Sequence, residues 1–348
     1  MRVTLTALVA LSLSMPHLAA HASANWVADQ AGGCKVVDEE FSPDHSVHWT
    51  GPCPGGVASG AGIAEFSAGG NPIRRVEGIF VKGAPDDGPI KITRYRDGAI
   101  VTVTDFTRTA GQIKDDVQKI TFYRDGAVAS EESGKWTGGK LNGACEIDRY
   151  TGGVKVKSIA GTCLNGTPQG VSKVRFYAPT AGHDLLFVGP YVNGRLEGHG
   201  ESSQVLTEAS TIPAEACLRP GDVTLHYVGD WKSNSMNGQG LIESHFCSQT
   251  PDGAVHHVTM TATGEWADSE QTGETLVEFT VDEGAPVQLK RIYDHGNVVS
   301  ETLVGAAPAA DAKPAHDDLL DHKTLCQKQP WICMNENSGA PFARGGGG

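Results

Sequence analysis

The sequence predicts an all-β protein built from successive β-hairpins and held together by disulfide bonds. The first observation is a string of glycines and aromatic residues that recurs at a fixed spacing along the chain. The second is a turn-forming dipeptide that follows most copies of the string. The third is that apolar residues do not follow a helical spacing, apart from a short stretch around residues 317–328.

The recurring string is clearest where it starts at Trp49. It has the form aromatic-x-Gly-x-aromatic-x2-Gly-x3-Gly-x-Gly, with Cys53 at the second aromatic position in this copy. The same spacing returns from Phe187 and from Tyr227, where Asn234 replaces one glycine, because Asn is the next-best residue at positive φ. A shorter copy starts at Ile159, and weaker ones start at Val76, Trp136 and Ala262.

The string has the properties of a β-hairpin. Apolar residues, aromatic residues and glycine occupy alternate positions, which places them on one face of a strand. A glycine on that face leaves room for a ring of the next unit to lie across the backbone. The turns are predicted at Gly55-Gly56, Asn142-Gly143, Asn165-Gly166 and Asn193-Gly194, and the return strands at residues 63–66, 174–176 and 241–246.

A second motif supports the same interpretation. Tyr95-Arg96-Asp97-Gly98 is repeated as Tyr123-Arg124-Asp125-Gly126, and a third copy reads Tyr293-Asp294-His295-Gly296. Each copy is predicted to form a strand, a tight turn and a second strand.

These strings resemble the MORN repeat family, specifically an exported bacterial variety with a Trp-x-Gly-x-Cys first unit, and the Tyr-x-Asp-Gly segments resemble the related YwqK-type repeat. The similarity spans about residues 34–302, although the spacing between units drifts more than in the regular family pattern. The resemblance implies an elongated, curved, single-layer antiparallel sheet whose face binds partners or mediates self-association. It implies no catalysis by the repeat itself.

The two ends of the chain differ in composition from the repeats. Residues 1–24 are typical of a signal peptide, with Arg2, an apolar run and an Ala22-Ser23-Ala24 cleavage site, so export to the periplasm or secretion is predicted. Residues 25–304 form the predicted repeat domain, which begins with a short leader over 25–33. Residues 305–318 have linker composition, and the tail 319–348 is expected to hold a small disulfide loop and to cap the last hairpin through Trp331.

All eight cysteines follow the signal, and their even number in an exported chain favours disulfides. Spacing alone allows many pairings. Sequential pairing is the preferred prediction: Cys34–Cys53, Cys145–Cys163, Cys217–Cys247 and Cys326–Cys333. A zinc site is disfavoured because no paired C-x2-C motif occurs.

Composition excludes several partners and sites. A net charge of −13 argues against nucleic acid and anionic lipid, and the apolar run of the signal is too short to span a bilayer. Motifs for a serine nucleophile, a metalloprotease or a phosphate loop are absent, so neither catalytic residues nor a cofactor are expected. The pairs His45/His48, His256/His257 and Asp86/Asp87 are interpreted as solvated, with a weak Ca²⁺ site at the last pair as the alternative, and no metal is predicted.

The aromatic residues of the repeats are the candidate binding residues. They fall at matched positions and would line one face of a stacked sheet: Trp49, Phe80, Trp136, Phe187, Tyr191, Tyr227, Trp231 and Trp266. One interpretation makes them the core between repeats. The other leaves part of the stripe exposed, as a surface for a protein, a glycan or a second copy of the chain.

The function predicted from these observations is that of a binding or scaffold protein without catalysis, whose partner is a protein or glycan of the cell envelope. Two alternatives stay open. An envelope hydrolase would need two carboxylates about 5 to 10 Å apart in a groove. An acidic inhibitor or immunity protein would use the negative charge to attract a basic effector.

Overall fold

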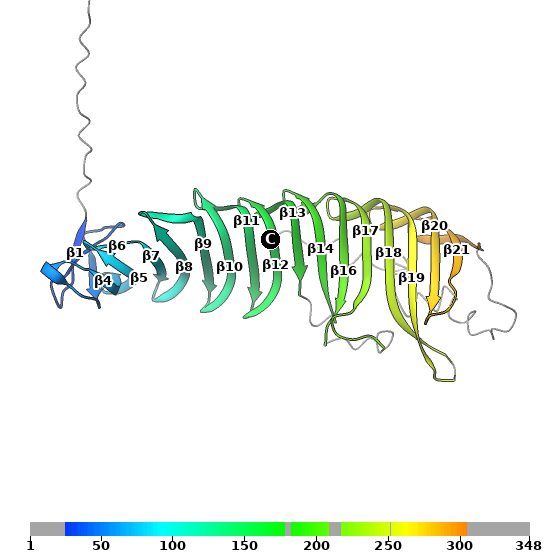
Figure 1. Cartoon of the computed structure of the whole chain (residues 1–348), viewed down its shortest axis with the longest axis horizontal. Helices are drawn as coiled ribbons and strands as arrows, with labels where there is room; N and C mark the ends of the chain where they lie inside the picture. Colours follow the sequence, from blue (N-terminus) through cyan, green and yellow to red (C-terminus); the bar gives the residue numbers. More distant parts are fainter. Residues whose placement is uncertain (1–24, 178–181, 209–216, 251, 305–348) are drawn as a thin grey trace, which may run out of the picture.

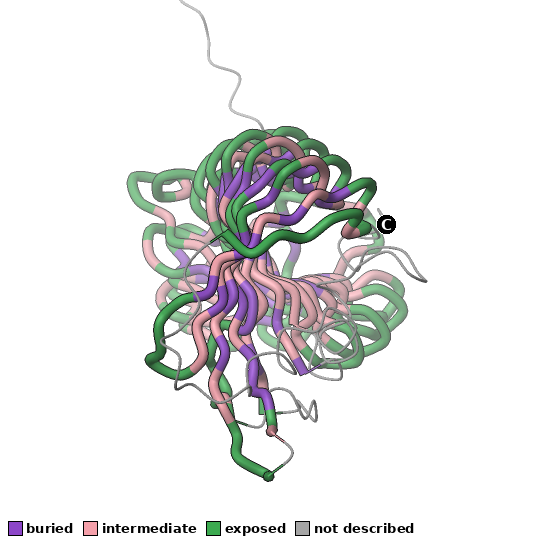
Figure 2. Tube along the Cα trace, turned by 90° about the vertical axis from the view of Figure 1, so that its right-hand side faces the viewer, coloured by how far each residue is buried: buried purple, intermediate pink, exposed green. Residues whose placement is uncertain are grey.

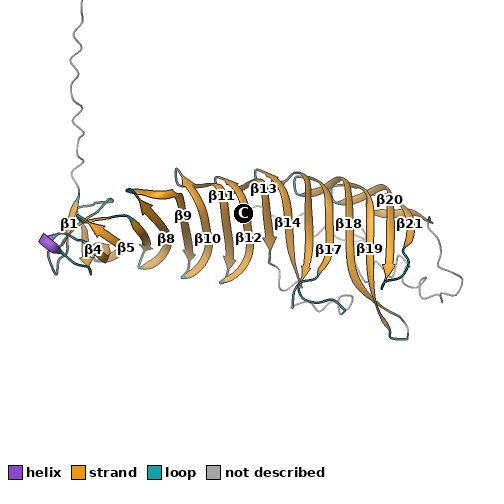
Figure 3. Cartoon of the chain, in the orientation of Figure 1, coloured by secondary structure: helices purple, strands orange, loops and turns teal. Residues whose placement is uncertain are grey.

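The computed structural model describes residues 25–177, 182–208, 217–250 and 252–304. Nearly all of these residues belong to one antiparallel sheet whose strands follow one another in chain order along a ribbon (Figure 1). Figure 3 shows strand throughout, and the only helical element in the described part is the 3₁₀ turn η1, Pro54–Gly56. The predicted all-β, elongated, curved, single-layer sheet is therefore confirmed.

The sheet runs from β3 to β22, and each strand pairs with the next one along the chain. The two-residue strands β6 and β15 pair only at the ends of β5 and β14, whose main partners are β7 and β16. A separate pair, β1 with β2, lies beside β3. The strands of the first half are β1 Trp26–Ala28, β2 Lys35–Val37, β3 His45–Trp49, β4 Gly60–Ala68, β5 Asn71–Val81, β6 Ala84–Pro85, β7 Gly88–Arg96, β8 Ala99–Thr109, β9 Gln112–Arg124, β10 Ala127–Thr137 and β11 Lys140–Thr151. Those of the second half are β12 Val154–Leu164, β13 Thr167–Phe176, β14 His183–Val192, β15 Arg195–Leu196, β16 Gly198–Leu206, β17 Val223–Lys232, β18 Ser235–Gln249, β19 Val255–Ala267, β20 Glu270–Val281, β21 Val287–Asp294 and β22 Asn297–Leu303.

One line of directly paired residues crosses the whole sheet, and we call it the central row. It consists of Trp49, Ala64, Val76, Ile92, Thr104, Ile120, Glu132, Ile147, Ile159, Val174, Phe187, Ser202, Tyr227, Ile242, Ala262, Val277, Leu289 and Leu303. Because side chains alternate between faces, this row marks the inner, apolar face of every strand. In the view along the ribbon, buried positions gather within the strands and the turns at the rim are exposed (Figure 2).

The repeated glycines form a second line on the inner face, two residues along from the central row, which we call the glycine row. Its members include Gly62, Gly78, Gly134, Gly161, Gly189, Gly200, Gly229, Gly240 and Gly264. A Cβ on Gly62 would lie 2.3 Å from the Trp49 ring, and one on Gly240 would lie 2.5 Å from the Tyr227 ring. The rings therefore need bare backbone beneath them, as predicted.

The source of the covering ring differs from the prediction. Trp49 covers Gly51, two residues later in its own segment, and Gly62 on the next strand, and Tyr227 covers Gly229 and Gly240 in the same way. We expected the ring of the next unit. The ring leans along its own strand instead, because that direction reaches the glycines of both its own strand and the neighbouring one.

Most predicted turns are confirmed, and one is wrong. Asn165-Gly166 and Asn193-Gly194 take positive φ at both positions and join consecutive strands, and the same holds for each copy of the second motif. Asn234 has a φ of 70°, in agreement with its place as a glycine substitute. Asn142-Gly143 lies inside β11 at a register shift; the turn before β11 is made by Gly138-Gly139.

Three disulfides follow the preferred sequential pairing: Cys34–Cys53, Cys145–Cys163 and Cys217–Cys247. They indicate an oxidising compartment outside the cytoplasm. The leader predicted at 25–33 contributes β1, which pairs with β2. The predictions for residues 1–24, 305–318 and 319–348, including Cys326–Cys333 and Trp331, fall outside the described residues.

Buried apolar residues form two separate cores on the sheet. The N-terminal core extends from Val27 to Ile90, and the C-terminal core extends from Leu141 to Leu289. No hydrophobic residue between Ile90 and Leu141 is buried. We call residues 91–140 the middle region; its buried residues are small and polar (Thr93, Thr121 and Ser130).

Candidate functional site

The predicted aromatic stripe lies in the two cores. Trp49, Phe80, Tyr191, Tyr227, Trp231 and Trp266 are buried, and Trp136 and Phe187 are partly buried against the C-terminal core. Burial raises the pKa of Tyr227 and of Tyr191 above the normal range for tyrosine. These rings therefore pack between repeats, and the structure does not leave them as an exposed strip.

The rings contact one another edge to face. In the C-terminal core the ring centroids are 5.9 Å apart for Phe187 and Trp231, 5.3 Å for Trp231 and Tyr227, and 5.5 Å for Tyr227 and Trp266. In the N-terminal core Trp49 and Phe80 are 4.6 Å apart. Such pairs add about 0.5 to 1.5 kcal/mol each beyond the burial of area.

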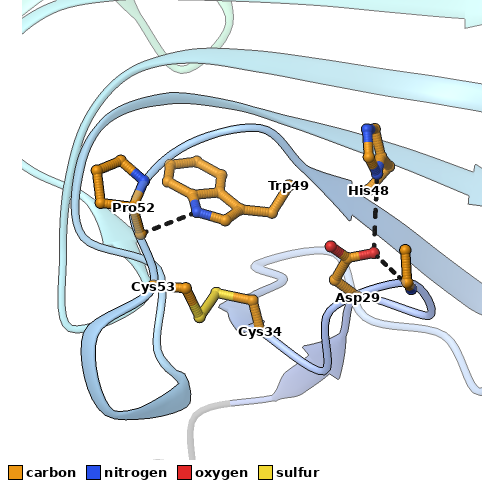
Figure 4. The surroundings of a disulfide bond; sticks show 7 residues. Asp29, Cys34, His48, Trp49, Pro52 and Cys53 are labelled. Atoms are coloured by element: carbon orange, nitrogen blue, oxygen red, sulfur yellow. Dashed lines mark hydrogen bonds and ion pairs between the residues drawn. A yellow bond between two sulfur atoms is a disulfide. The ribbon is translucent and has the colours of Figure 1, made fainter.

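The surroundings of the first disulfide show how the N-terminal end is closed (Figure 4). The Trp49 indole N–H donates to the Pro52 carbonyl at 3.0 Å, and Cys53 links this turn to Cys34. His48 lies 3.7 Å from the carboxylate of Asp29, on the segment before Cys34. The disulfide and these polar contacts hold the leader against β3 and the turn that follows it.

A group of charges lies beside this closure, with Asp38 and Arg74 buried and Glu40 and Arg94 exposed. Asp38 accepts hydrogen bonds from Arg74 at 2.6 Å and from His45 at 2.7 Å. The guanidinium of Arg94 donates two hydrogen bonds to the carboxylate of Glu40. The bond from Arg94, helped by the nearby Arg74, lowers the pKa of Glu40 to about 2. Burial alone would raise the pKa of Asp38, but its hydrogen bonds hold it below the ordinary value. This network ties the loop before β3 to β5 and β7, which is a structural role.

The middle region carries accessible apolar side chains on the inner face. Ile92 and Ile120 belong to the central row, Phe106 lies opposite Ile90 on the neighbouring line, and Phe122 lies two residues beyond Ile120 on the same face. All four are partly exposed. We call these four residues the middle face. The exposed Val117 pairs with Lys135 and directly precedes the inner-face residue Gln118, so Val117 lies on the opposite, outer face of the sheet.

The glycine row changes composition beside the middle face. On β7, β8 and β9 its positions are taken by Ile90, Phe106 and Gln118, and glycine returns on β10 at Gly134. A side chain at these positions leaves no bare backbone for a ring to cover, and the middle region has no equivalent of Trp49 or Tyr227 on the central row. The inner face there is only half covered.

A groove of about 680 Å³ crosses β5, β7, β8, β9 and the edge of β10, which is a volume typical of ligand sites. Its position follows from a bulge in β9, where four residues, Lys114–Val117, are inserted opposite Thr107, and Asp115 and Asp116 have positive φ. Apolar and charged side chains line it: Ile90, Phe106, Val117, Glu77, Lys91, Asp105, Lys114, Asp115 and Lys119.

The charges of this groove alternate in sign from strand to strand. Lys91 lies 3.7 Å from Asp105, and beside the groove Lys119 lies 2.9 Å from Glu131 and Lys135 lies 3.1 Å from Asp116. Glu77, Lys91, Asp105 and Lys119 form one line of directly paired residues between the central row and the glycine row. Their side chains therefore lie on the outer face of the sheet, opposite the middle face.

A second, smaller cavity lies on the inner face at the C-terminal end. Its volume is about 40 Å³, and its lining includes Met260, Trp266, Val277, Arg291 and Tyr293. That volume holds a few water molecules at most. Arg291 continues the glycine row at this end, is 1% exposed, and donates from Nε to Glu301 at 2.6 Å, so it joins β21 to β22.

The histidines weighed as metal ligands are distributed among acids and other rings. His256 lies 2.8 Å from Asp282, while His257 is on the opposite face and stacks on His245 with ring centroids 5.8 Å apart. His45 is held by Asp38. Among the residues described, His, Cys, Asp and Glu form no group of three that could hold a metal ion. Asp87 accepts hydrogen bonds from the backbone of Ala110 and Gly111, which fixes the turn between β8 and β9.

In comparisons with known proteins, no protein-family model and no curated protein matches the chain. The part of the chain that the structure describes contains no helix long and apolar enough to cross a membrane.

The sequence prediction missed the middle face. Its aromatic candidates came from the glycine-spaced string, and that string marks positions where rings become buried. The available signal was the opposite one: between the weak copies at Val76 and Trp136 the string is missing, while β-branched and aromatic residues still alternate, as in Thr102, Thr104 and Phe106.

Proposed function

We propose that this chain is an exported, MORN-like β-repeat protein of the periplasm or extracellular space that binds a protein or glycan of the cell envelope. It acts as a binding or scaffold module without catalysis, and the partner binds at the groove that crosses the middle region, beside Val117. This assignment of the family and compartment follows from the repeat strings and the signal-like N-terminus, and the three disulfides agree with it.

One observation carries the proposal: the hydrophobic core is interrupted over residues 91–140 while the sheet continues without a break. Strands held only by their ladders and by half-covered side chains are poorly stabilised on their own. The groove over this part of the sheet presents the exposed Val117 among charges of both signs, which is typical of a surface that a partner completes.

The test compares two exposed valines. Val117 lines the groove and is 46% exposed, and Val171 on β13 is 71% exposed and lies outside the groove. A photo-crosslinking amino acid replaces each in turn in the exported protein, and adducts are collected from whole cells. We expect a discrete adduct from position 117 and none from position 171.

A second arm separates the two partner classes. The purified protein is sedimented with isolated cell-wall glycan, as wild type, Val117→Asp and Val171→Asp. Loss of sedimentation only in Val117→Asp would identify a glycan, and a protein adduct without sedimentation would identify a protein. Equal adducts from both positions, or none from position 117 in cells that export the protein, would refute the proposal.

A further inference from the structure

The two edge strands of the sheet, β3 and β22, differ in how they are covered. At the N-terminal edge, β1 and β2 lie beside β3, with bridges from Asp29 to Val47 and from Lys35 to Val57. The backbone N–H of Ala58 also donates to the Lys35 carbonyl at 3.0 Å. The disulfide Cys34–Cys53 fastens this cover (Figure 4). Val36 and Val47 are buried.

The C-terminal edge has no such cover among the residues that the structure describes. There, β22 pairs with β21 alone and lies at the opposite end of the ribbon from β3 (Figure 1). Val299, Leu303 and Val304 are 60%, 54% and 57% exposed. Leu303 is the last member of the central row, so the inner apolar line ends on an exposed leucine.

The composition of β22 offers little protection against pairing with strands of other molecules. Proteins protect edge strands with lysine, proline or an inward charge, because free N–H and C=O groups otherwise recruit further strands. This strand has neither lysine nor proline, and its one inward charge, on Glu301, pairs with Arg291. Val299, Leu303 and Val304 are exposed beside this pair, so the edge has apolar surface that a further segment can cover.

The part of the chain that follows β22 is a candidate to cover this edge. It continues for 44 residues beyond Val304, directly from this edge. The first 14 of them, residues 305–318, could extend over about 46 Å, and β22 is only about 23 Å long. Residues 319–334 follow, with apolar side chains at Leu319, Leu320, Leu325, Trp331, Ile332 and Met334.

The cysteine count and the charge of residues 319–334 both favour this segment as the cover of β22. Six of the eight cysteines are used in the three disulfides, which leaves Cys326 and Cys333 for each other within one chain. The segment 319–334 carries two lysines against one aspartate, whereas the whole chain has a net charge of −13. A second copy of the acidic chain would meet electrostatic repulsion at this edge, and the segment would not.

We propose that residues 319–334, closed by a Cys326–Cys333 disulfide, dock on β22 and cover Val299 and Leu303 as a C-terminal cap. This cap is the counterpart of the β1–β2 cover at the other edge. It keeps the ribbon from adding strands of other molecules. The proposed cap does not depend on the middle region or on a partner that binds there.

The experiment uses the full chain with a specific protease site placed within residues 305–318, cut only after folding. We expect the released C-terminal peptide to co-elute with the sheet in size-exclusion chromatography. In the uncut monomer, the amide hydrogens of residues 297–303 should exchange at least about 100-fold more slowly than in the unfolded chain. Separation of the peptide together with fast exchange in β22 would overturn the proposal.

Two further readouts separate the alternatives. Trp331→Ser should speed exchange in β22 by about tenfold or more, while Phe342→Ser, an aromatic substitution in the same tail but outside the segment, should leave it unchanged. Equal effects of the two variants would count against docking through residues 319–334. Protection of β22 that appears only at concentrations where a dimer forms would show a second copy at the edge, and would also overturn the proposal.

Discussion

The middle region and the C-terminal core share one sheet and one central row, yet they are packed differently. On the C-terminal side, Ile147, Ile159 and Val174 follow each other along the row and are buried, and further along the same core the Tyr227 ring covers Gly229 and Gly240. In the middle, Ile92 and Ile120 occupy the same row and are partly exposed. A position on the central row therefore does not by itself determine that a side chain is buried.

One difference lies in the neighbouring glycine row. Where that row holds glycine, a ring on the central row can lie over two strands, as Trp49 and Tyr227 do. Where it holds Phe106 or Gln118, the backbone is already covered and no ring is present on the central row. The glycine row therefore contributes to the packing of the inner face at these rings.

The largest expected effect tests this comparison on a single row. Ile147→Ala removes a fully buried side chain and should lower the free energy of unfolding by about 4 kcal/mol, whereas Ile120→Ala should lower it by no more than about 1 kcal/mol. Urea unfolding followed by hydrogen exchange of β9 and β11 measures both. Equal losses would show that the middle region is as well packed as the C-terminal core.

The glycine row gives the second test. Gly240→Ala places a Cβ 2.5 Å from the Tyr227 ring, and it should cost about 3 kcal/mol because the ring is fully buried and has little room to move. Gly32→Ala, whose Cβ would lie 3.5 Å from its nearest neighbour, is the control and should change stability by less than about 0.5 kcal/mol.

Combining Gly240→Ala with Tyr227→Leu sharpens this test. Removing the ring removes the clash, so the double variant should lose clearly less than the sum of the two single losses. Additive losses in urea unfolding would mean that the glycine is required for a reason other than the ring.

The smallest expected effect concerns the charges of the N-terminal core. The pKa of Glu40 falls from 4.5 to about 2 through its bonds with Arg94 and the nearby Arg74. A carboxyl group with a lowered pKa stabilises the fold fully above its unfolded value, and this contribution disappears as pH falls from about 4.5 to about 2. Acid should therefore loosen the N-terminal core within that range.

The matched variant is Arg94→Met, which removes the main cause of the shift. It should move the acid transition of β5 and β7, followed by hydrogen exchange, upward by about half a pH unit and leave that of the C-terminal core unchanged. An unchanged transition in β5 and β7 would show that the Glu40 contacts contribute nothing to stability.

Local patterns determined much of this protein. The Gly and aromatic spacing, the positive-φ turns and the even cysteine count were sufficient to predict hairpins, their order and three disulfides, because each depends on residues close together in the chain. Asn142-Gly143 shows the limit: the dipeptide suits a turn and a bulge equally, and only the pairing of β10 with β11 decides between them.

What the tertiary structure decided was the exposure of the inner face. The sequence placed the rings on one face and left two interpretations, core or binding strip. The curved sheet packs them into the two cores, where Trp49 and Tyr227 lie over glycines of their own and the adjacent strand. The exposure of the middle face also depends on which residues of neighbouring strands meet across the register. That alignment arises from pairing between strands, and no single stretch of sequence contains it.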